Sequence, residues 1–246
     1  MTDFPLAIIA DIHGNSWALD AVLHDIQHKN IQRIVNLGDC LLGPLDPAGT
    51  ADRLIDLNIL TIQGNDDRIL LAPPEHPSAA TTYTLEHLAP AHLEWIRSFP
   101  TTAVVANEIF LFHGDLAADE TYLLEEVTSH GVFLRNTVGI AAAVAHIDQK
   151  VILCGHSHMP RTIFLPSGKL IVNPGSVGMP AYTSDLPLPH GMESGSPHAK
   201  YAVLNKVGNA WQVEHVQVPY DWEKVASVAL DNGRSDWAKW IDTGRL

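Results

Sequence analysis

The sequence predicts an α/β fold, and three observations support this prediction. Short apolar runs typical of buried strands alternate with segments of helical periodicity. The chain has 246 residues, which is enough to bury the core of one large domain. No internal repeat or linker-like stretch divides the sequence. We therefore expect a single α/β domain that spans residues 1–246.

The predicted strands are short and mostly apolar, as expected for strands inside an α/β sheet. The strand candidates are Leu6–Ala10, Ile31–Asn36, Leu57–Ile62, Thr102–Val105, Glu108–Phe112, Val151–Cys154, Arg161–Leu165, Lys169–Val172, Tyr201–Leu204 and Trp211–Val218. Turn residues at Ala106-Asn107 and Gly208-Asn209 favour two hairpins among them.

Helical spacing of apolar residues defines the segments between these strands. The helix candidates are Asn15–His28, Ala48–Leu57, Thr84–Arg97, Asp119–His146 as two helices divided near Gly131, and Asp221–Trp240. Residues 181–200 contain three prolines with several serines and glycines, which predicts a long loop. A mobile lid, an oligomer contact and plain disorder remain open for this loop.

The composition excludes several classes of function. Lys and Arg total 15 against 28 Asp and Glu, a net charge of −13, so we expect no stable nucleic-acid complex. Two cysteines are too few for a disulfide framework and indicate a reducing compartment. With neither a signal sequence nor a membrane-spanning apolar run, we expect a cytoplasmic protein that does not bind membranes. A homo-oligomer remains open.

Five short polar motifs each follow an apolar strand candidate. They are Asp11-Ile12-His13-Gly14-Asn15, Gly38-Asp39, Gly64-Asn65-Asp66-Asp67, His113-Gly114-Asp115 and Gly155-His156-Ser157-His158. Strand ends of an α/β sheet gather at one edge, where ligands usually bind. Because side chains alternate along an extended strand, Asp11 and His13 should project together, and so should His156 and His158. The motifs are therefore expected to converge.

Imidazole, carboxylate and amide groups together are typical ligands of divalent metal ions such as Mn²⁺, Fe²⁺, Zn²⁺ or Co²⁺. Two such ions about 3.5–4 Å apart share a carboxylate, lower the pKa of a bridging water and hold phosphate oxygens. This chemistry also explains how an acidic protein attracts an anionic substrate. The fourteen histidines have a simpler alternative explanation, which is a histidine-rich surface.

The ordered motifs D-x-H, G-D, G-N, H and G-H-x-H resemble those of the calcineurin-like metallophosphoesterase superfamily. Asn173-Pro174-Gly175-Ser176 is similar to a segment of its small bacterial and archaeal branch. The resemblance covers residues 11–176, about two-thirds of the chain. It implies a four-layer α/β/β/α sandwich of two mixed sheets flanked by helices. It also implies hydrolysis of phosphodiesters or phosphomonoesters by a metal-bridged hydroxide.

The resemblance further implies the ligands of two divalent ions, with Mn²⁺ preferred and Fe, Zn, Co or Ni as alternatives. One ion would be held by Asp11, His13, Asp39 and His158. The other would be held by Asp39, Asn65, His113 and His156. Asp39 would then bridge the ions, and Asp39, His113 and Asp66 are the candidate catalytic residues.

Asp66 departs from the pattern of the superfamily. Many members have a histidine at this position, where it assists the leaving group or stabilises the transition state. An aspartate could act as a general acid only if its pKa were raised by burial or by neighbouring carboxylates. An ionised Asp66 would instead repel phosphate or favour a metal ion.

Each residue also fits a structural role when taken alone. Asn15 is best explained as a helix N-cap. Cys40 and Cys154 fit small buried residues, with redox sensitivity as the alternative. Trp211, Trp222, Trp237 and Trp240 fit packing of the C-terminal segments. Arg161, His190 and His198 are minor candidates for contacts with the substrate.

The sequence leaves three functions open. The first is a phosphoesterase that acts on small phosphorylated substrates, and the second is an asymmetric dinucleoside polyphosphate hydrolase. The third is a non-catalytic scaffold of the same fold, similar to the retromer subunit that has lost much of its metal site, because fold alone does not fix function.

Overall fold

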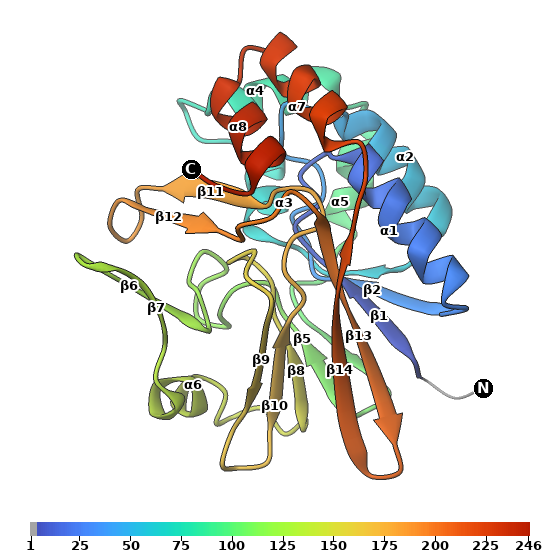
Figure 1. Cartoon of the computed structure of the whole chain (residues 1–246), viewed down its shortest axis with the longest axis vertical. Helices are drawn as coiled ribbons and strands as arrows, with labels where there is room; N and C mark the ends of the chain where they lie inside the picture. The colour runs from blue at the N-terminus through green and yellow to red at the C-terminus, as the bar shows by residue number, and fades with distance from the viewer. Residues whose placement is uncertain (1–3) are drawn as a thin grey trace.

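The computed structural model describes residues 4–246, and its core consists of two five-stranded mixed sheets (Figure 1). The first sheet has the order β14-β13-β1-β2-β3, built from β1 (Leu6–Ile9), β2 (Arg33–Asn36), β3 (Leu60–Thr61), β13 (Ala199–Val207) and β14 (Ala210–Val218). The second has the order β4-β5-β8-β10-β9, built from β4 (Ala103–Val105), β5 (Ile109–Leu111), β8 (Val151–Leu153), β9 (Arg161–Phe164) and β10 (Leu170–Asn173).

Each sheet has a parallel part that positions the site. Strands β1, β2 and β3 are parallel, and β13 and β14 extend that sheet in antiparallel fashion. Strands β5, β8 and β10 are parallel, with β4 and β9 antiparallel at the edges. Two separate hairpins pair β6 (Glu125–Thr128) with β7 (Gly131–Leu134), and β11 (Ala181–Ser184) with β12 (His190–Glu193).

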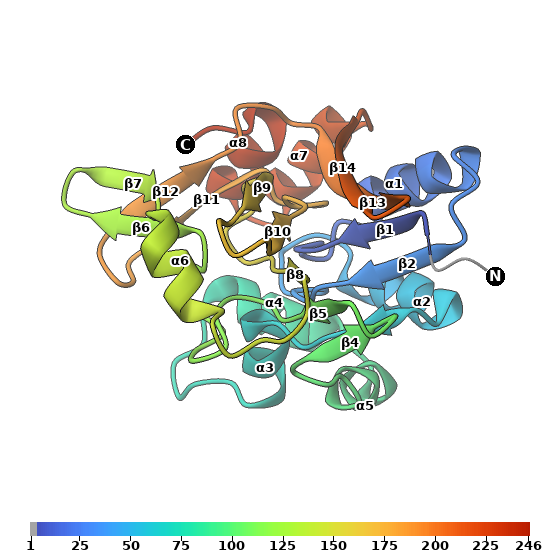
Figure 2. The same ribbon diagram turned by 90° about the horizontal axis from the view of Figure 1, so that it is seen from below.

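Helices cover the outer faces of the two sheets (Figure 2). They are α1 (Ser16–His28), α2 (Pro47–Leu57), α3 (Asn65–Leu71), α4 (Ala79–His87), α5 (Pro90–Arg97), α6 (Thr137–Ala143), α7 (Trp222–Asp231) and α8 (Ser235–Thr243). Helices α1, α2, α7 and α8 contribute to the core on the first sheet, and α6 covers the second. Among residues 4–246, no helix has the length and apolar character needed to span a membrane.

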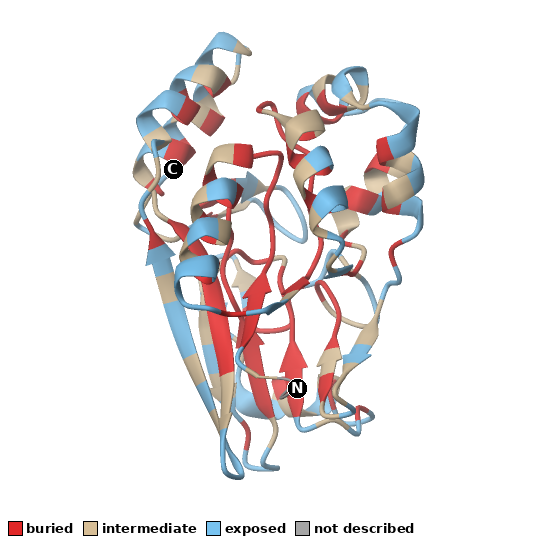
Figure 3. Ribbon diagram, turned by 90° about the vertical axis from the view of Figure 1, so that its right-hand side faces the viewer, coloured by how far each residue is buried: buried red, intermediate tan, exposed pale blue. Residues whose placement is uncertain are grey.

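Strand β1 shows why the apolar runs of the sequence are continuous. Leu6 and Ile8 join the core between the two sheets, whereas Ala7 and Ile9 join the core under the helices. Both faces of the strand are buried, as Figure 3 shows for the central strands. A strand with two buried faces needs apolar residues at every position. This arrangement confirms the predicted four-layer sandwich.

Local sequence signals account for the ends of several helices. The Asn15 side chain accepts a hydrogen bond from the Ala18 N–H at 3.1 Å, so its predicted role as the N-cap of α1 is confirmed. Asp46 caps α2 in the same way. Pro90 begins α5 and separates it from α4, so the prediction of one helix over Thr84–Arg97 was wrong.

Two further predictions were wrong. The segment Asp119–His146 was expected to form two helices, but it forms the β6–β7 hairpin followed by the single helix α6. Gly131, at φ +127°, makes the tight turn of this hairpin possible. The predicted loop at 181–200 contains the β11–β12 hairpin and the start of β13. The C-terminal helical segment divides into α7 and α8.

Candidate metal centre

The five polar motifs lie beyond the carboxyl ends of β1, β2, β3, β5 and β8, where the two sheets meet. Backbone hydrogen bonds join their loops. Asp11 N–H donates to the Gly38 carbonyl at 3.0 Å, and Gly155 N–H donates to the His113 carbonyl at 2.7 Å. The His156 N–H then reaches Asp11 Oδ1 at 3.3 Å, which connects the first sheet to the second. The predicted convergence of the motifs is confirmed.

The side chains of these loops form three overlapping groups with metal-ligand character. In each group the ligand atoms lie within 4.8 Å of one another. The groups are Asp11 with His13 and His158, Asp39 with His113 and His156, and His13 with Asp39 and Asp66. Asp39 therefore lies between the ligands of one expected ion and those of the other. This is the position that a bridging carboxylate needs.

Three of the histidines are oriented by backbone carbonyls. Nδ1 of His13 contacts the Leu42 carbonyl at 3.0 Å. Nδ1 of His113 contacts the Leu37 carbonyl at 2.7 Å, and Nδ1 of His158 contacts the Met179 carbonyl at 2.7 Å. A carbonyl accepts but cannot donate, so each Nδ1 carries the proton and leaves the Nε2 lone pair to the centre. This outer support is typical of histidines that bind metal ions.

Several lone pairs at the centre face one another without a donor between them. Among residues 4–246, the buried side-chain atoms that have no hydrogen-bond partner are Asp11 Oδ2, Asn65 Oδ1 and His113 Nε2. In addition, His13 Nε2 lies 3.1 Å from His158 Nε2. Buried acceptors without a donor are costly unless a cation lies between them. The donor set therefore fits divalent metal ions.

Charge and burial act together on these groups. Burial lowers the pKa of His13 and that of His156 to about 4, so both rings are neutral at pH 7. Burial would also lower the pKa of His113, but Asp39 Oδ2, 3.1 Å from Nε2, outweighs it and raises the pKa to about 10. The same pairing holds the pKa of Asp39 below its usual range, against the effect of burial. Without a metal ion, His113 Nε2 therefore carries a proton beside Asp39, at the place where a bound cation would replace it.

The ligands do not converge by strand alternation, as the sequence argument assumed. Strands β1 and β8 end at Ile9 and Leu153, before the ligand residues. Asp11, His13, Asp39, His156 and His158 have positive φ between 51° and 69°. Non-glycine residues rarely adopt this left-handed backbone, which costs about 1–3 kcal/mol each. His156 and His158 belong to different groups, and both line the same cavity.

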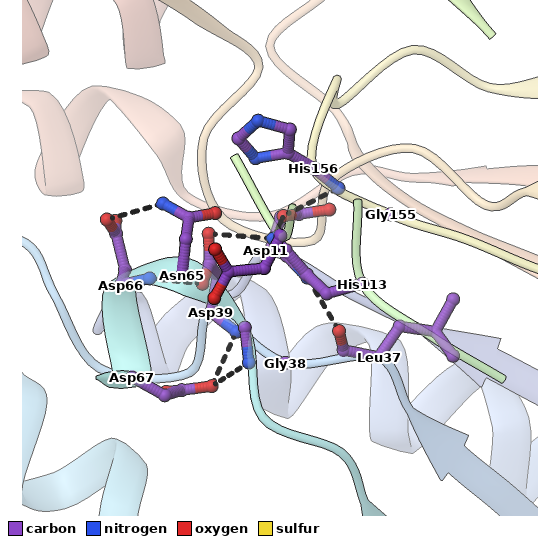
Figure 4. A network of polar contacts seen from close by, with 12 residues as sticks. Asp11, Leu37, Gly38, Asp39, Asn65, Asp66, Asp67, His113, Gly155 and His156 are labelled. Carbon is purple, nitrogen blue, oxygen red and sulfur yellow. Dashed lines mark hydrogen bonds and ion pairs between the residues drawn. The ribbon is translucent and has the colours of Figure 1, made fainter. Parts of the chain in front are cut away.

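Asn65 lies beside Asp39 at the centre (Figure 4), and Gly64 precedes it in the chain. Asn65 Nδ2 donates to Asp66 Oδ1 at 3.1 Å, which turns Oδ1 of Asn65 toward the ligands. Asp66 N–H donates to Asp39 Oδ1 at 2.9 Å. A Cβ atom on Gly64 would lie 2.1 Å from that same oxygen. Only glycine leaves room for the Asp39 carboxylate here.

Asp67 is a supporting residue that the sequence analysis missed. Its buried carboxylate accepts backbone N–H groups of Asp39, Cys40 and Gly64 at 2.8, 3.0 and 3.0 Å. Burial and the charge of Asp39 raise its pKa to about 7, whereas the N–H donors favour the ionised form. The carboxylate fixes two ligand loops relative to each other. Its place at the third position of α3, where a capping carboxylate reaches back to the helix start, was the available signal.

The Asn173–Ser176 segment ties the two sheets together behind the ligands. Asn173 Nδ2 donates to the Gly155 carbonyl at 2.7 Å and to Ser157 Oγ at 3.1 Å. Ser176 Oγ donates to the Asp11 carbonyl at 2.7 Å. These bonds hold the loops of Asp11 and of His156 in place. The segment singled out in the sequence is therefore a support for the site.

Asp66 lies at the edge of the centre and lines an adjoining cavity of about 580 Å³. Burial, followed by the charges of Asp39 and Asp67, raises its pKa well above the usual range. Its Oδ2 lies 3.5 Å from His13 Nδ1. This position is compatible with contact to a metal ion or to a substrate, and the choice between the two stays a prediction.

The minor candidates for substrate contacts do not line the cavity beside the metal centre. Arg161 pairs with Glu125 at 3.3 Å and lines a second cavity of about 260 Å³. His190 Nε2 contacts Tyr122 Oη at 2.9 Å, and the His198 ring packs on Trp222. Cys40 and Cys154 are buried, as their small size suggested. Neither Arg161, His190 nor His198 lines the cavity beside the metal ligands.

Fold and site together define a metal-binding phosphoesterase scaffold, and the comparisons specify the family. Residues 5–187 match the model of the calcineurin-like phosphoesterase superfamily domain. The chain belongs to this superfamily. It is 24% identical, over 94% of each chain, to an uncharacterized protein of Methanocaldococcus jannaschii.

Two solved structures have a similar fold. A metallophosphoesterase from Sphaerobacter thermophilus is 23% identical, with 98% of this chain and 100% of that chain covered and a TM-score of 0.76. A candidate diadenosine tetraphosphatase is 13% identical, with 87% of this chain and 93% of that chain covered and a TM-score of 0.55. At these identities the structural likeness shows the fold alone.

Proposed function

We propose that the protein is a dinuclear, Mn²⁺-dependent phosphoesterase that hydrolyses phosphodiesters or phosphomonoesters. The observation that carries this proposal is the arrangement of the ligand groups, with Asp39 placed between them and three unpartnered lone-pair atoms facing inward. Membership of the calcineurin-like phosphoesterase superfamily supports the same reaction class.

The proposed ligands are those that the resemblance implied. Asp11, His13 and His158 would hold one ion. Asn65, His113 and His156 would hold the other, and Asp39 would contact both. When bound, two divalent ions lower the pKa of a water molecule and neutralise the charge of a phosphate.

The residues of the chain contribute preorganisation. The carbonyls of Leu37, Leu42 and Met179 fix the direction in which three imidazoles present Nε2. Asp67 fixes the backbone of the bridging Asp39. A site held rigid in this way needs little rearrangement when charge develops on the phosphate oxygens.

Hydrolysis of 4-nitrophenyl phosphate and bis(4-nitrophenyl) phosphate by Mn²⁺-loaded protein tests the proposal. We expect turnover by the wild type and a loss of about 100-fold or more in Asp39→Asn, because the variant removes the shared charge. Asp20→Asn, a surface carboxylate paired with Arg53, is the matched control and should keep full activity. A folded, metal-loaded wild type that hydrolyses neither ester would favour the scaffold interpretation instead.

A further inference from the structure

Residues of the C-terminal part of the chain form one wall of the cavity beside the metal centre. Its inner end is lined by His13, Asp39, His156 and His158. Its outer wall includes residues of α8, which lies next to the β11–β12 hairpin in Figure 1. The matched superfamily domain ends at residue 187, before α8 begins.

Large apolar side chains form this wall. Trp237 and Trp240 of α8 line the cavity, with ring centroids 6.2 Å apart and planes tilted by 43°. The Trp237 ring lies 6.1 Å from the ring of His13. Leu186, from the loop between β11 and β12, also lines the cavity although it is 69% exposed. A substituent on a phosphate held at His13 would meet indole and aliphatic carbon.

The charges of the wall disfavour a second phosphate. Among the described lining residues, Arg234 is the one arginine or lysine. One edge of its guanidinium donates to the Asp236 carboxylate, from Nε at 2.9 Å and from Nη2 at 2.6 Å. The lining also contains the carboxylates of Asp66 and Glu120. Beyond the metal ligands, this cavity offers apolar surface, hydroxyl groups and carboxylates, and its one arginine is paired with Asp236.

We infer that this wall selects phosphoesters that carry a single phosphate and a flat aromatic substituent, with Trp240 and Leu186 as specificity-determining residues. The inference rests on the proposed function, since the metal centre must hold the phosphate. An aromatic ring offers a large apolar area at little conformational cost and packs well on indole. A substrate with several phosphates would find, beyond the metal ligands, one arginine in the cavity lining, and that arginine is already paired with Asp236.

Titration calorimetry of Mn²⁺-loaded protein with phenylphosphonate and methylphosphonate tests the inference without turnover. The two probes share one phosphonate group and differ in the flat ring. We expect phenylphosphonate to bind the wild type about tenfold more tightly or better, as stacking on an aromatic side chain does. The ratio of the two dissociation constants should fall at least about threefold in Trp240→Leu, which keeps apolar volume but removes the flat indole.

Two further variants make the result specific. Leu186→Ala alters an exposed residue, so it should fold normally and also lower the ratio. Trp211→Leu, on β14 and outside the cavity lining, should leave the ratio unchanged. Equal affinities of the two probes for the wild type, or an unchanged ratio in both Trp240→Leu and Leu186→Ala, would overturn the inference. Selective binding without hydrolysis would contradict the proposed function alone.

Discussion

Replacing Gly64 by alanine adds one methyl group beside Asp39, the proposed bridging ligand. The Cβ atom would lie 2.1 Å from Asp39 Oδ1 and 2.7 Å from Asp39 N. The backbone of Gly64, at φ −93° and ψ 175°, is open to any residue, so the cost arises from the contact alone. A Cβ atom on Gly38 would lie 2.5 Å from Gly64 N, so the backbones of the two glycines pack closely. The Asp39 carboxylate must therefore move.

The size of the displacement follows from the contact distance. To reach the 3.0 Å below which Cβ contacts are essentially not seen, the oxygen must shift by about 0.9 Å. Catalytic groups tolerate about 0.5 Å, and a 1 Å misplacement costs about 100-fold in rate. Overpacking should also reduce the unfolding free energy by about 1–3 kcal/mol. We expect Gly64→Ala to lose about 100-fold in kcat/KM and to bind metal more weakly.

Gly139→Ala is the matched control for the same substitution. Gly139 lies inside α6, and its added Cβ would lie 3.1 Å from the flexible Arg135 side chain. Alanine in place of glycine in a helix stabilises by about 0.5–1 kcal/mol. Metal content, kcat/KM with bis(4-nitrophenyl) phosphate and thermal unfolding should be measured for both variants. Wild-type metal affinity and activity in Gly64→Ala would refute the reasoning.

Two more predictions follow from the supporting residues. Asp67→Asn keeps the shape of the side chain but can present only one oxygen to the three N–H donors. The affinity for Mn²⁺ should therefore fall about 10- to 100-fold. Equilibrium dialysis that gives the wild-type affinity would contradict this prediction. Burial lowers the pKa of Lys200, whose Nζ donates to the Ser196 and His198 carbonyls, to about 8. Between pH 8 and 10.5 the unfolded chain then binds more protons than the folded protein, so stability rises with pH. Relative to Lys200→Met, the wild type should gain about 1–3 kcal/mol of unfolding free energy over this range in urea titrations, and a constant difference would rule out the buried charge.

The sequence predicted the sheet strands well because each buried strand carries its own signal. Strands β1, β8 and β10 are apolar at nearly every position, since both faces contact a core. The two small hairpins were missed for the opposite reason. Strand β7, with Val132, Phe133 and Leu134, is largely exposed, so its apolar residues follow no buried pattern. Such strands depend on their partner rather than on periodicity.

The order of the motifs predicted the positions of the candidate ligands, but the sequence did not predict the backbone geometry of these residues. Residue type and spacing identified Asp11 and His13, but nothing in the sequence showed that their backbone is left-handed. Likewise, Asp67 of α3 pairs with the Asp39 loop, which is 28 residues away in the sequence. The indole wall was not predicted either. The sequence indicated that Trp237 and Trp240 pack in the core, but it did not show that they also line the cavity.

The most direct test of the account is a count of bound metal ions, with their separation. Elemental analysis of protein loaded with Mn²⁺ and freed of excess metal, followed by anomalous diffraction, should find two ions per chain about 3.5–4 Å apart. Asp39 should contact both ions. One ion or none per chain, or two ions without Asp39 between them, would contradict the central claim.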